Sequence, residues 1–184
     1  MKLATREIIK LIDKKTIEKF KIPGLTLMEN AGRASSDVIC NNYPDAKEIG
    51  IICGGGNNGG DGFVIARQLI SRGKNVRTYI INNRNEYNGD AKTNLEALLK
   101  ISDKVVELKD SISRIKDADI FVDAIFGTGL DREVRGFYKK IISRLNNSDK
   151  PCVSIDIPSG LDCNTGRPLG ISVIADTTIT FVIP

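Results

Sequence analysis

A glycine-rich segment of this 184-residue chain combines residue types that suit phosphate binding. It reads Cys-Gly-Gly-Gly-Asn-Asn-Gly-Gly-Asp-Gly at 53–62 and lies between an apolar run at 49–52 and a helical pattern at 63–69. Glycines permit a sharp turn, and backbone N–H groups at the start of a helix attract anions. We therefore expect a phosphate-sized cradle that also presents the side chains of Asn57, Asn58 and Asp61.

Other interpretations of this segment remain open. The spacing Gly54-x-Gly56-x-x-Gly59 fits a dinucleotide fingerprint, but the next expected strand ends at Asn82-Asn83, without the acidic residue that would bind a ribose. Neither Lys nor Ser/Thr follows the glycines, which excludes a P-loop. A purely structural turn is an alternative, although such a turn seldom needs two amides and a carboxylate.

A second polar group lies within and after the apolar run at 120–126. Asp123 is a carboxylate inside this run, where an unpaired charge is costly, so a cation or a set of donors should face it. A helix cap or a pair with a lysine is the structural alternative. The loop at 127–133 then offers a pliable Gly-Thr-Gly backbone, and Arg132 and Arg135 are available to oppose phosphates.

A third polar group, Asp-Ile-Pro-Ser-Gly-Leu-Asp at 156–162, follows another expected strand. A single Asp before a turn is usually structural, but here three strand ends each deliver polar groups beside glycines. Asn58, Asp123 and Ser159 offer oxygen ligands without a thiolate or an imidazole, which suits a hard cation better than zinc. The small number of carboxylates favours a monovalent ion such as potassium.

The composition excludes several functions. The chain has no histidine, which removes Ser-His-Asp and Cys-His catalysis and HExxH zinc sites. The net charge of +4 is spread along the chain, and no basic run is interleaved with aromatics, so nucleic acid is not an expected partner. No apolar run reaches membrane-spanning length, and the four cysteines lack CxxC spacing, so we expect no membrane association and free thiols in the cytoplasm.

The elements that must position these residues alternate between strand and helix patterns. Strands are expected at Glu48–Cys53, Val76–Ile81, Val105–Leu108, Ile120–Phe126, Val153–Ile157 and Thr177–Ile183. Helices between them are expected at Gly62–Ser71, Asp90–Ile101, Ser111–Lys116 and Phe137–Leu145.

Two further amphipathic helices are expected near the N-terminus, one over 8–17 and one that starts with a capping-box spacing at Thr26 and runs towards Ile39. Repeated βα units predict a Rossmann-like three-layer α/β/α sandwich with a mostly parallel sheet, which binds ligands at the carboxyl ends of its strands. The apolar faces of the two N-terminal helices either cover the sheet or form a homodimer interface.

Taken together, the motifs resemble the NAD(P)HX epimerase family, also called the YjeF N-terminal domain family. The resemblance is carried by 54–62, 123–130 and 156–162, with flanking matches at 27–32 and 175–181. It implies one domain over residues 1–184. Because only Pro184 follows the last expected strand, we also consider a domain that is shortened at its C-terminus or cut from a bifunctional epimerase/dehydratase.

The resemblance implies an isomerase that interconverts the R and S epimers of NADHX and NADPHX in nicotinamide nucleotide repair. It implies an ADP- or ATP-dependent, S-specific dehydratase as functional partner, and one K+ per subunit bound by Asn58, Asp123 and Ser159. The implied substrate-binding residues are Asn57, Asn58, Gly59, Gly60, Asp61, Gly127, Thr128, Gly129, Leu130, Asp131, Arg132, Glu133 and Asp156.

Epimerising a carbinolamine carbon needs neither a redox change nor an imidazole. We expect an acid to assist departure of the C6 hydroxyl, the ring nitrogen to stabilise the cation, and water to return to the other face. Asp156 is the first candidate for proton transfer and Asp123 the second; if Asp123 binds potassium, its role is positioning.

Two other functions are alternatives. A non-catalytic nucleotide-binding interaction module can share the fold, but it has no need of buried carboxylates at strand ends. An NAD-dependent dehydrogenase would lack its ribose-binding acid. The sequence does not distinguish NADHX from NADPHX as the preferred substrate.

Overall fold

A six-stranded sheet forms the centre of the protein, and all neighbouring strands run parallel. The computed structural model describes residues 4–181. The strand order is β3-β2-β1-β4-β5-β6, which reverses direction between β1 and β4, the point at which such sheets bind ligands. The strands are β1 (Glu48–Cys53), β2 (Asn75–Ile80), β3 (Val105–Glu107), β4 (Ile120–Ala124), β5 (Cys152–Ile155) and β6 (Thr177–Ile179).

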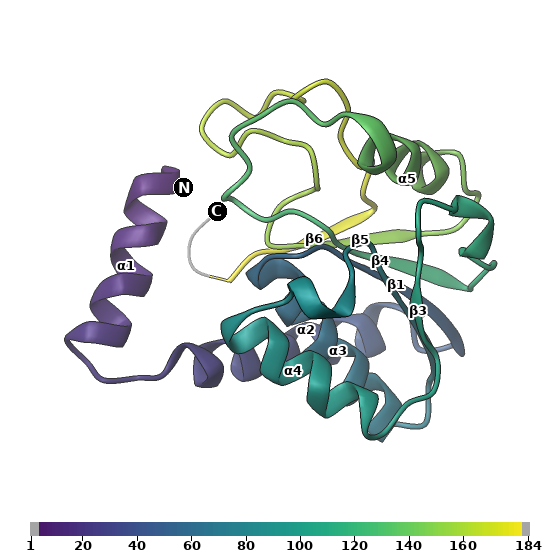
Figure 1. Cartoon of the computed structure of the whole chain (residues 1–184), viewed down its shortest axis with the longest axis horizontal. Coiled ribbons are helices and arrows are strands. Elements are labelled where there is room, and N and C mark those ends of the chain that lie inside the picture. The colour runs from purple at the N-terminus through teal and green to yellow at the C-terminus, as the bar shows by residue number, and fades with distance from the viewer. Residues whose placement is uncertain (1–3, 182–184) are drawn as a thin grey trace.

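Helices cover both faces of this sheet. In Figure 1, α2, α3 and α4 lie on one side of it and α5 on the other, so the predicted three-layer α/β/α sandwich is confirmed. The helices are α1 (Arg6–Glu18), α2 (Gly24–Asn42), α3 (Asn57–Ser71), α4 (Gly89–Leu99) and α5 (Gly136–Asn146), with short 3-10 turns at Arg84–Glu86 and Ile112–Arg114.

The core consists of two apolar layers, one on each face of the sheet. Side chains alternate along β1, so that Ile51 packs with Phe63 beneath α3 while Ile52 packs with Phe121 and Ile141 beneath α5. Because both faces are covered, the central strands are almost entirely apolar, and each such buried side chain contributes roughly 1.5–3 kcal/mol. The rigid sheet that results fixes the loops at its carboxyl edge.

Several predicted boundaries were wrong. Helix α3 begins at Asn57, not at Gly62, because Gly56 is the N-cap and the next residues form the first turn. Helix α2 begins at Gly24 directly after Pro23, so Thr26 lies inside it and makes no cap. The helix expected at 111–116 is only a 3-10 turn. The last strand spans three residues, and residues 182 and 183 of its predicted range lie outside those described.

Helix α1 stands apart from the sandwich, beside the ends of the strands (Figure 1). It contains no buried residue, and Ile8, Leu11 and Ile17 are exposed. Ile39 of α2 packs in the apolar layer on one face of the sheet, so the covering alternative is confirmed for α2. It is wrong for α1, which contributes no residue to either apolar layer. The homodimer remains a prediction.

The four cysteines, as predicted, are free thiols: Cys53 and Cys152 are buried, whereas Cys40 and Cys163 are half-buried. Within residues 4–181, no helix has the combination of length and apolar character that crossing a bilayer requires.

Candidate functional site

The buried carboxylate of Asp123 is the centre of a dense set of hydrogen bonds. Its Oδ2 accepts from the Ser154 hydroxyl at 2.8 Å and from the Ser159 amide at 2.9 Å. Its Oδ1 accepts from the Ser159 hydroxyl at 2.5 Å and from the Ile125 amide at 3.2 Å. The partner expected for Asp123 is therefore a set of donors, and among the described residues neither a helix end nor a lysine takes this role.

These bonds connect the ends of β4 and β5. Ser159 Oγ also accepts from the Phe126 amide at 2.8 Å, so Ser159 holds both Asp123 and the start of the loop after β4. Burial raises the pKa of Asp123, while the Ser159 and Ser154 donors act in the opposite direction by stabilising its ionised form. Sequence analysis missed Ser154, because a serine in an apolar strand gives no signal until its neighbour across the sheet is known.

Asn58 has a buried side-chain amide that finds no hydrogen-bond partner among residues 4–181. Only 7% of the residue is exposed, and both Oδ1 and Nδ2 lack a partner in the structure. A buried amide without partners is costly, so a ligand absent from the structure is the natural partner for it. Asn58 lies in the first turn of α3, and its Cβ is 3.5 Å from the place that a Cβ on Gly127 would occupy. The cradle and the loop after β4 thus meet at this point.

Asp156 adopts a strained backbone conformation. Its φ is 69°, and the Ile157 amide donates to the Ile155 carbonyl at 2.9 Å across it, which makes a three-residue γ-turn of the rare kind with positive φ. The Asp156 amide donates to the Ile179 carbonyl of β6 at 2.8 Å, and the sheet thereby holds the turn in place. Such strain is found at functional sites. It aims the carboxylate towards the loop after β4.

The Asp156 carboxylate contacts this loop directly. Its Oδ2 accepts from the Thr128 amide at 2.8 Å. A Cβ on Gly127 would collide with the same oxygen, so only glycine permits this approach. Burial is the main cause that raises the pKa of Asp156, and the Thr128 donor opposes it. A carboxyl group with a raised pKa can act as a general acid.

Asp61 is a third carboxyl group at the same edge. Burial raises its pKa well above the ordinary value, and the negative charges of Asp156 and Asp13 raise it further. Asp61 is therefore protonated more readily than an exposed Asp. Asp13 belongs to α1, which sequence analysis did not place at the site; a charged residue on a surface helix carries no signal of its partners.

The loop at 127–133 does not present all its predicted residues in one direction. Leu130 is buried with Val134 in the apolar layer beneath α5, so its side chain anchors the loop. Asp131 and Arg132 are exposed. Glu133 pairs with Arg135 at 2.6 Å. One of the two arginines that were expected to oppose phosphates therefore already contacts a carboxylate.

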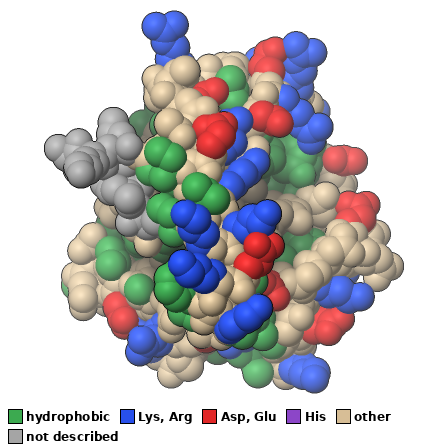
Figure 2. All heavy atoms as spheres, turned by 90° about the vertical axis from the view of Figure 1, so that its left-hand side faces the viewer, with side chains coloured by type: hydrophobic (Ala, Val, Ile, Leu, Met, Phe, Trp, Pro, Cys, Tyr) green, Lys and Arg blue, Asp and Glu red, His purple; other side chains and the backbone are tan. Residues whose placement is uncertain are grey.

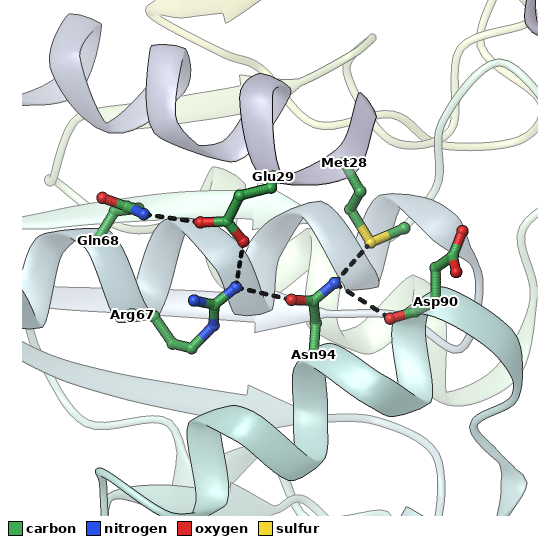
Figure 3. A network of polar contacts seen from close by, with 6 residues as sticks. All are labelled: Met28, Glu29, Arg67, Gln68, Asp90 and Asn94. Atoms are coloured by element: carbon green, nitrogen blue, oxygen red, sulfur yellow. Dashed lines mark hydrogen bonds and ion pairs between the residues drawn. The ribbon is translucent and has the colours of Figure 1, made fainter. Parts of the chain in front are cut away.

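Helix α3, which carries Asn58 and Asp61, is held by polar contacts from two other helices (Figure 3). Glu29 of α2 accepts from Arg67 at 2.5 Å and from Gln68 at 2.8 Å. Arg67 also donates to Asn94 of α4 at 2.7 Å, and Asn94 donates to the Met28 sulfur at 3.2 Å. This network explains the flanking match at 27–32, because that segment fixes the orientation of the helix that carries the site.

Comparison with known proteins agrees with this geometry. The model of the family described as "YjeF-related protein N-terminus" matches residues 24–184. The chain belongs to this family. The family predicted from the motifs is thereby confirmed. The matched region contains α2 to β6 and all the strand ends described above, whereas α1 precedes it.

Individual relatives place the chain among two kinds of protein. The NAD(P)H-hydrate epimerase of Limosilactobacillus fermentum is 40% identical over 170 residues, which cover 92% of this chain and 80% of that protein. The bifunctional NAD(P)H-hydrate repair enzyme Nnr of Thermofilum pendens is 38% identical over all of this chain, which spans 36% of the longer protein. The crystal structure of yeast ynu0, YNL200c, superposes with a TM-score of 0.90 at 26% identity, over 100% of this chain and 82% of the yeast chain.

Proposed function

We propose that this chain is an NAD(P)H-hydrate epimerase that interconverts the R and S epimers of NADHX and NADPHX. The observation that carries the proposal is that two groups lie beside Gly127: Asp156, a carboxyl group with a raised pKa, and Asn58, a buried amide without a partner among the described residues. The names of relatives that share most of their length with this chain support it. The fold alone would support many functions.

The residues at the switch point have separate roles in this reaction. The N-terminus of α3 and the glycine-rich turn before it attract the diphosphate of the nucleotide. Asp156, protonated more readily than an exposed Asp, gives its proton to the departing hydroxyl of the ring carbon and takes one back from the water that adds to the other face. Asp123 accepts hydrogen bonds from Ser154 and Ser159, so it positions the two loops.

Potassium fits the residues present. The Asn58 amide oxygen lacks a partner, Asp123 carries the negative charge, and the Ser159 hydroxyl contacts Asp123. An amide, a carboxylate and a hydroxyl are hard oxygen donors, and one carboxylate suits a monovalent ion. When bound, the ion would supply positive charge beside the cradle, where the nucleotide phosphates are expected. We propose Asn58, Asp123 and Ser159 as the residues that hold it.

The product of the reaction implies a partner. Epimerisation leaves the hydroxyl on the ring and therefore does not by itself regenerate NADH or NADPH. An S-specific dehydratase driven by ADP or ATP must consume the S epimer. This chain spans about a third of the length of the bifunctional relatives. These relatives support a dehydratase on the same natural chain or in the same cell. The free thiols support a reducing compartment such as the cytoplasm.

A direct assay tests the function. R-NADPHX, separated from its S epimer, is followed by chromatography with and without the protein, in potassium chloride and then in sodium chloride. We expect interconversion faster than the spontaneous rate, and faster in potassium. Tight nucleotide binding without acceleration would refute the enzyme and favour a binding module.

A further inference from the structure

Helix α1 is attached to the substrate loop by a single arginine. The Arg6 guanidinium donates from Nε to the Thr128 carbonyl at 2.7 Å and from Nη2 to the Leu130 carbonyl. The Arg6 backbone amide donates to Asn164 Oδ1 at 2.9 Å. Two carbonyls held by one planar fork fix the distance between them, which a lysine cannot reproduce. Arg6 is thus placed to set the shape of the loop after β4.

The same peptide segment reaches Asp156. Thr128 accepts from Arg6 with its carbonyl and donates from its amide to Asp156 Oδ2 at 2.8 Å. Hydrogen bonds in sequence through one residue couple the positions of the groups at the two ends. A shift of Thr128 after loss of Arg6 would therefore change the direction in which the Asp156 carboxyl group points.

One face of α1 is turned towards the site. Arg6, Ile9, Asp13 and Thr16 recur at spacings of three and four residues, which places them on the same side of a helix. Of these, Arg6, Ile9 and Thr16 are half-buried although α1 has no fully buried residue. Asp13 on this face is exposed, and its negative charge adds slightly to the raised pKa values of Asp61 and Asp156.

The opposite face of α1 is open. Figure 2 looks onto this side of the molecule, where hydrophobic and basic side chains share the surface; Ile8 is 46% exposed and Leu11 is 50% exposed. Core packing therefore does not explain why α1 stays where it is. Within residues 4–181, the hydrogen bonds that join α1 to distant parts of the chain are those of Arg6, and they go to the loop after β4 and to Asn164.

We propose that α1 is a wall of the nucleotide site and that Arg6 is a positioning residue of the epimerase, which holds the 127–133 loop and, through Thr128, the carboxyl group of Asp156. The kinetic part of this inference rests on the proposed function. The structural part does not, because it concerns the loop in the free protein.

Three variants separate this role from a general effect of α1. Arg6→Gln removes both carbonyl contacts, and Arg6→Lys keeps the charge but not the fork. Lys10→Gln is the matched control, since Lys10 is an exposed cation on the same helix. Asn164→Ala removes the acceptor of the Arg6 amide, together with a weak contact from the Cys163 thiol, and leaves both guanidinium contacts in place. It gives a milder second variant in case Arg6→Gln lowers the yield of folded protein.

The first readout is hydrogen exchange of the Thr128 amide in the free protein, measured by NMR. Arg6→Gln should accelerate it about tenfold, as expected for the loss of one hydrogen bond. Asn164→Ala should accelerate it less, and Lys10→Gln should leave it unchanged. Unchanged exchange in Arg6→Gln would overturn the proposal, whatever the kinetics show.

The second readout is steady-state kinetics with R-NADPHX. Arg6→Gln should lower kcat about tenfold with a smaller change in KM, because the misplaced group is the acid and not the phosphate cradle. Arg6→Lys should recover part of kcat. Equal kcat values for Arg6→Gln and Lys10→Gln would overturn the proposal. An inactive wild-type protein in which Arg6→Gln still accelerates Thr128 exchange would refute the proposed function and leave the positioning role supported.

Discussion

Ser159 gives Asp123 two hydrogen bonds, one from its hydroxyl at 2.5 Å and one from its amide at 2.9 Å. The two residues come from the ends of neighbouring strands, so a single residue closes the gap between β4 and the turn after β5. Because Asp123 is fully buried, each of these donors offsets the cost of its charge. The site is therefore built around a carboxylate that also holds the sheet edge together.

Ser159→Ala should destabilise the protein by about 1–3 kcal/mol, since a buried carboxylate loses a charge-assisted partner. Urea unfolding, followed by circular dichroism, measures the change. Ser71→Ala is the control, because the Ser71 hydroxyl is exposed and bonds only to the Gln68 carbonyl in its own helix. Its cost should stay within about 0.5 kcal/mol. Similar costs for the two variants would mean that Ser159 does not stabilise Asp123.

Asn58→Ala should abolish the response to potassium without destabilising the fold. The Asn58 amide has no partner in the part of the chain that the structure describes, so its removal breaks no hydrogen bond there and removes a buried polar group. Thermal unfolding tests the stability, and the rate of epimerisation tests the response to potassium. Each is compared in potassium and sodium chloride at equal ionic strength. A potassium effect that survives in Asn58→Ala would exclude this residue as a ligand.

Asp156→Asn should lower kcat roughly 10²- to 10⁴-fold, the usual contribution of a general acid. Asparagine keeps the shape of the side chain and tolerates the positive φ of this position, so the γ-turn should persist. Nucleotide affinity, measured by titration calorimetry with NADPH, should change little. An equal loss of affinity and turnover would show that Asp156 binds and does not transfer the proton.

The pH profile of kcat should follow the protonated form of Asp156. Burial raises its pKa above the ordinary 3.8, so the acid persists to higher pH than in an exposed Asp, and kcat should fall as pH rises through the raised value. The stability that this protonated group contributes is lost over the same pH window. Profiles of wild type and Asp156→Asn give the comparison. A falling limb that remains in Asp156→Asn would move the role of acid to Asp61 or Asp123.

Glu29→Ala should destabilise the protein by about 1–3 kcal/mol, because the partly buried Arg67 guanidinium loses its carboxylate, and Arg67 Nε already lacks a partner. Asp37→Ala is the matched control, since the Arg72–Asp37 pair also joins α3 to α2 but the Asp37 side chain is 55% exposed. Its cost should be below about 1 kcal/mol. Urea unfolding of the two variants distinguishes an anchoring network from an ordinary surface pair.

The sequence predicted the sheet well because strands covered on both faces are apolar along their whole length, as Ile49 to Ile52 are. Because parallel strands bring their carboxyl ends to one edge, the sequence also predicted that the segments after these strands would meet. Asn58 and Asp156 do both lie beside Gly127. The start of α3 was wrong, since glycines argue against a helix by propensity, whereas here close packing at its first turn requires them.

Contacts that depend on long-range packing had no sequence signal. Arg6 reaches carbonyls more than 120 positions away along the chain, and backbone carbonyls are the same in every residue. Ser154 and Asp13 were missed for the same reason. The left-handed backbone of Asp156 was also not predicted, although Pro158-Ser159-Gly160 indicated a turn nearby.

The γ-turn at Asp156 places stability and activity in opposition at one residue. A positive φ costs a side-chain-bearing residue roughly 1–3 kcal/mol, and the half-buried carboxyl group adds to this cost when it ionises. Glycine would remove both costs together with the acid. Selection for heat resistance alone would thus replace the residue on which turnover depends, so at this position thermostability can be gained only by giving up catalysis.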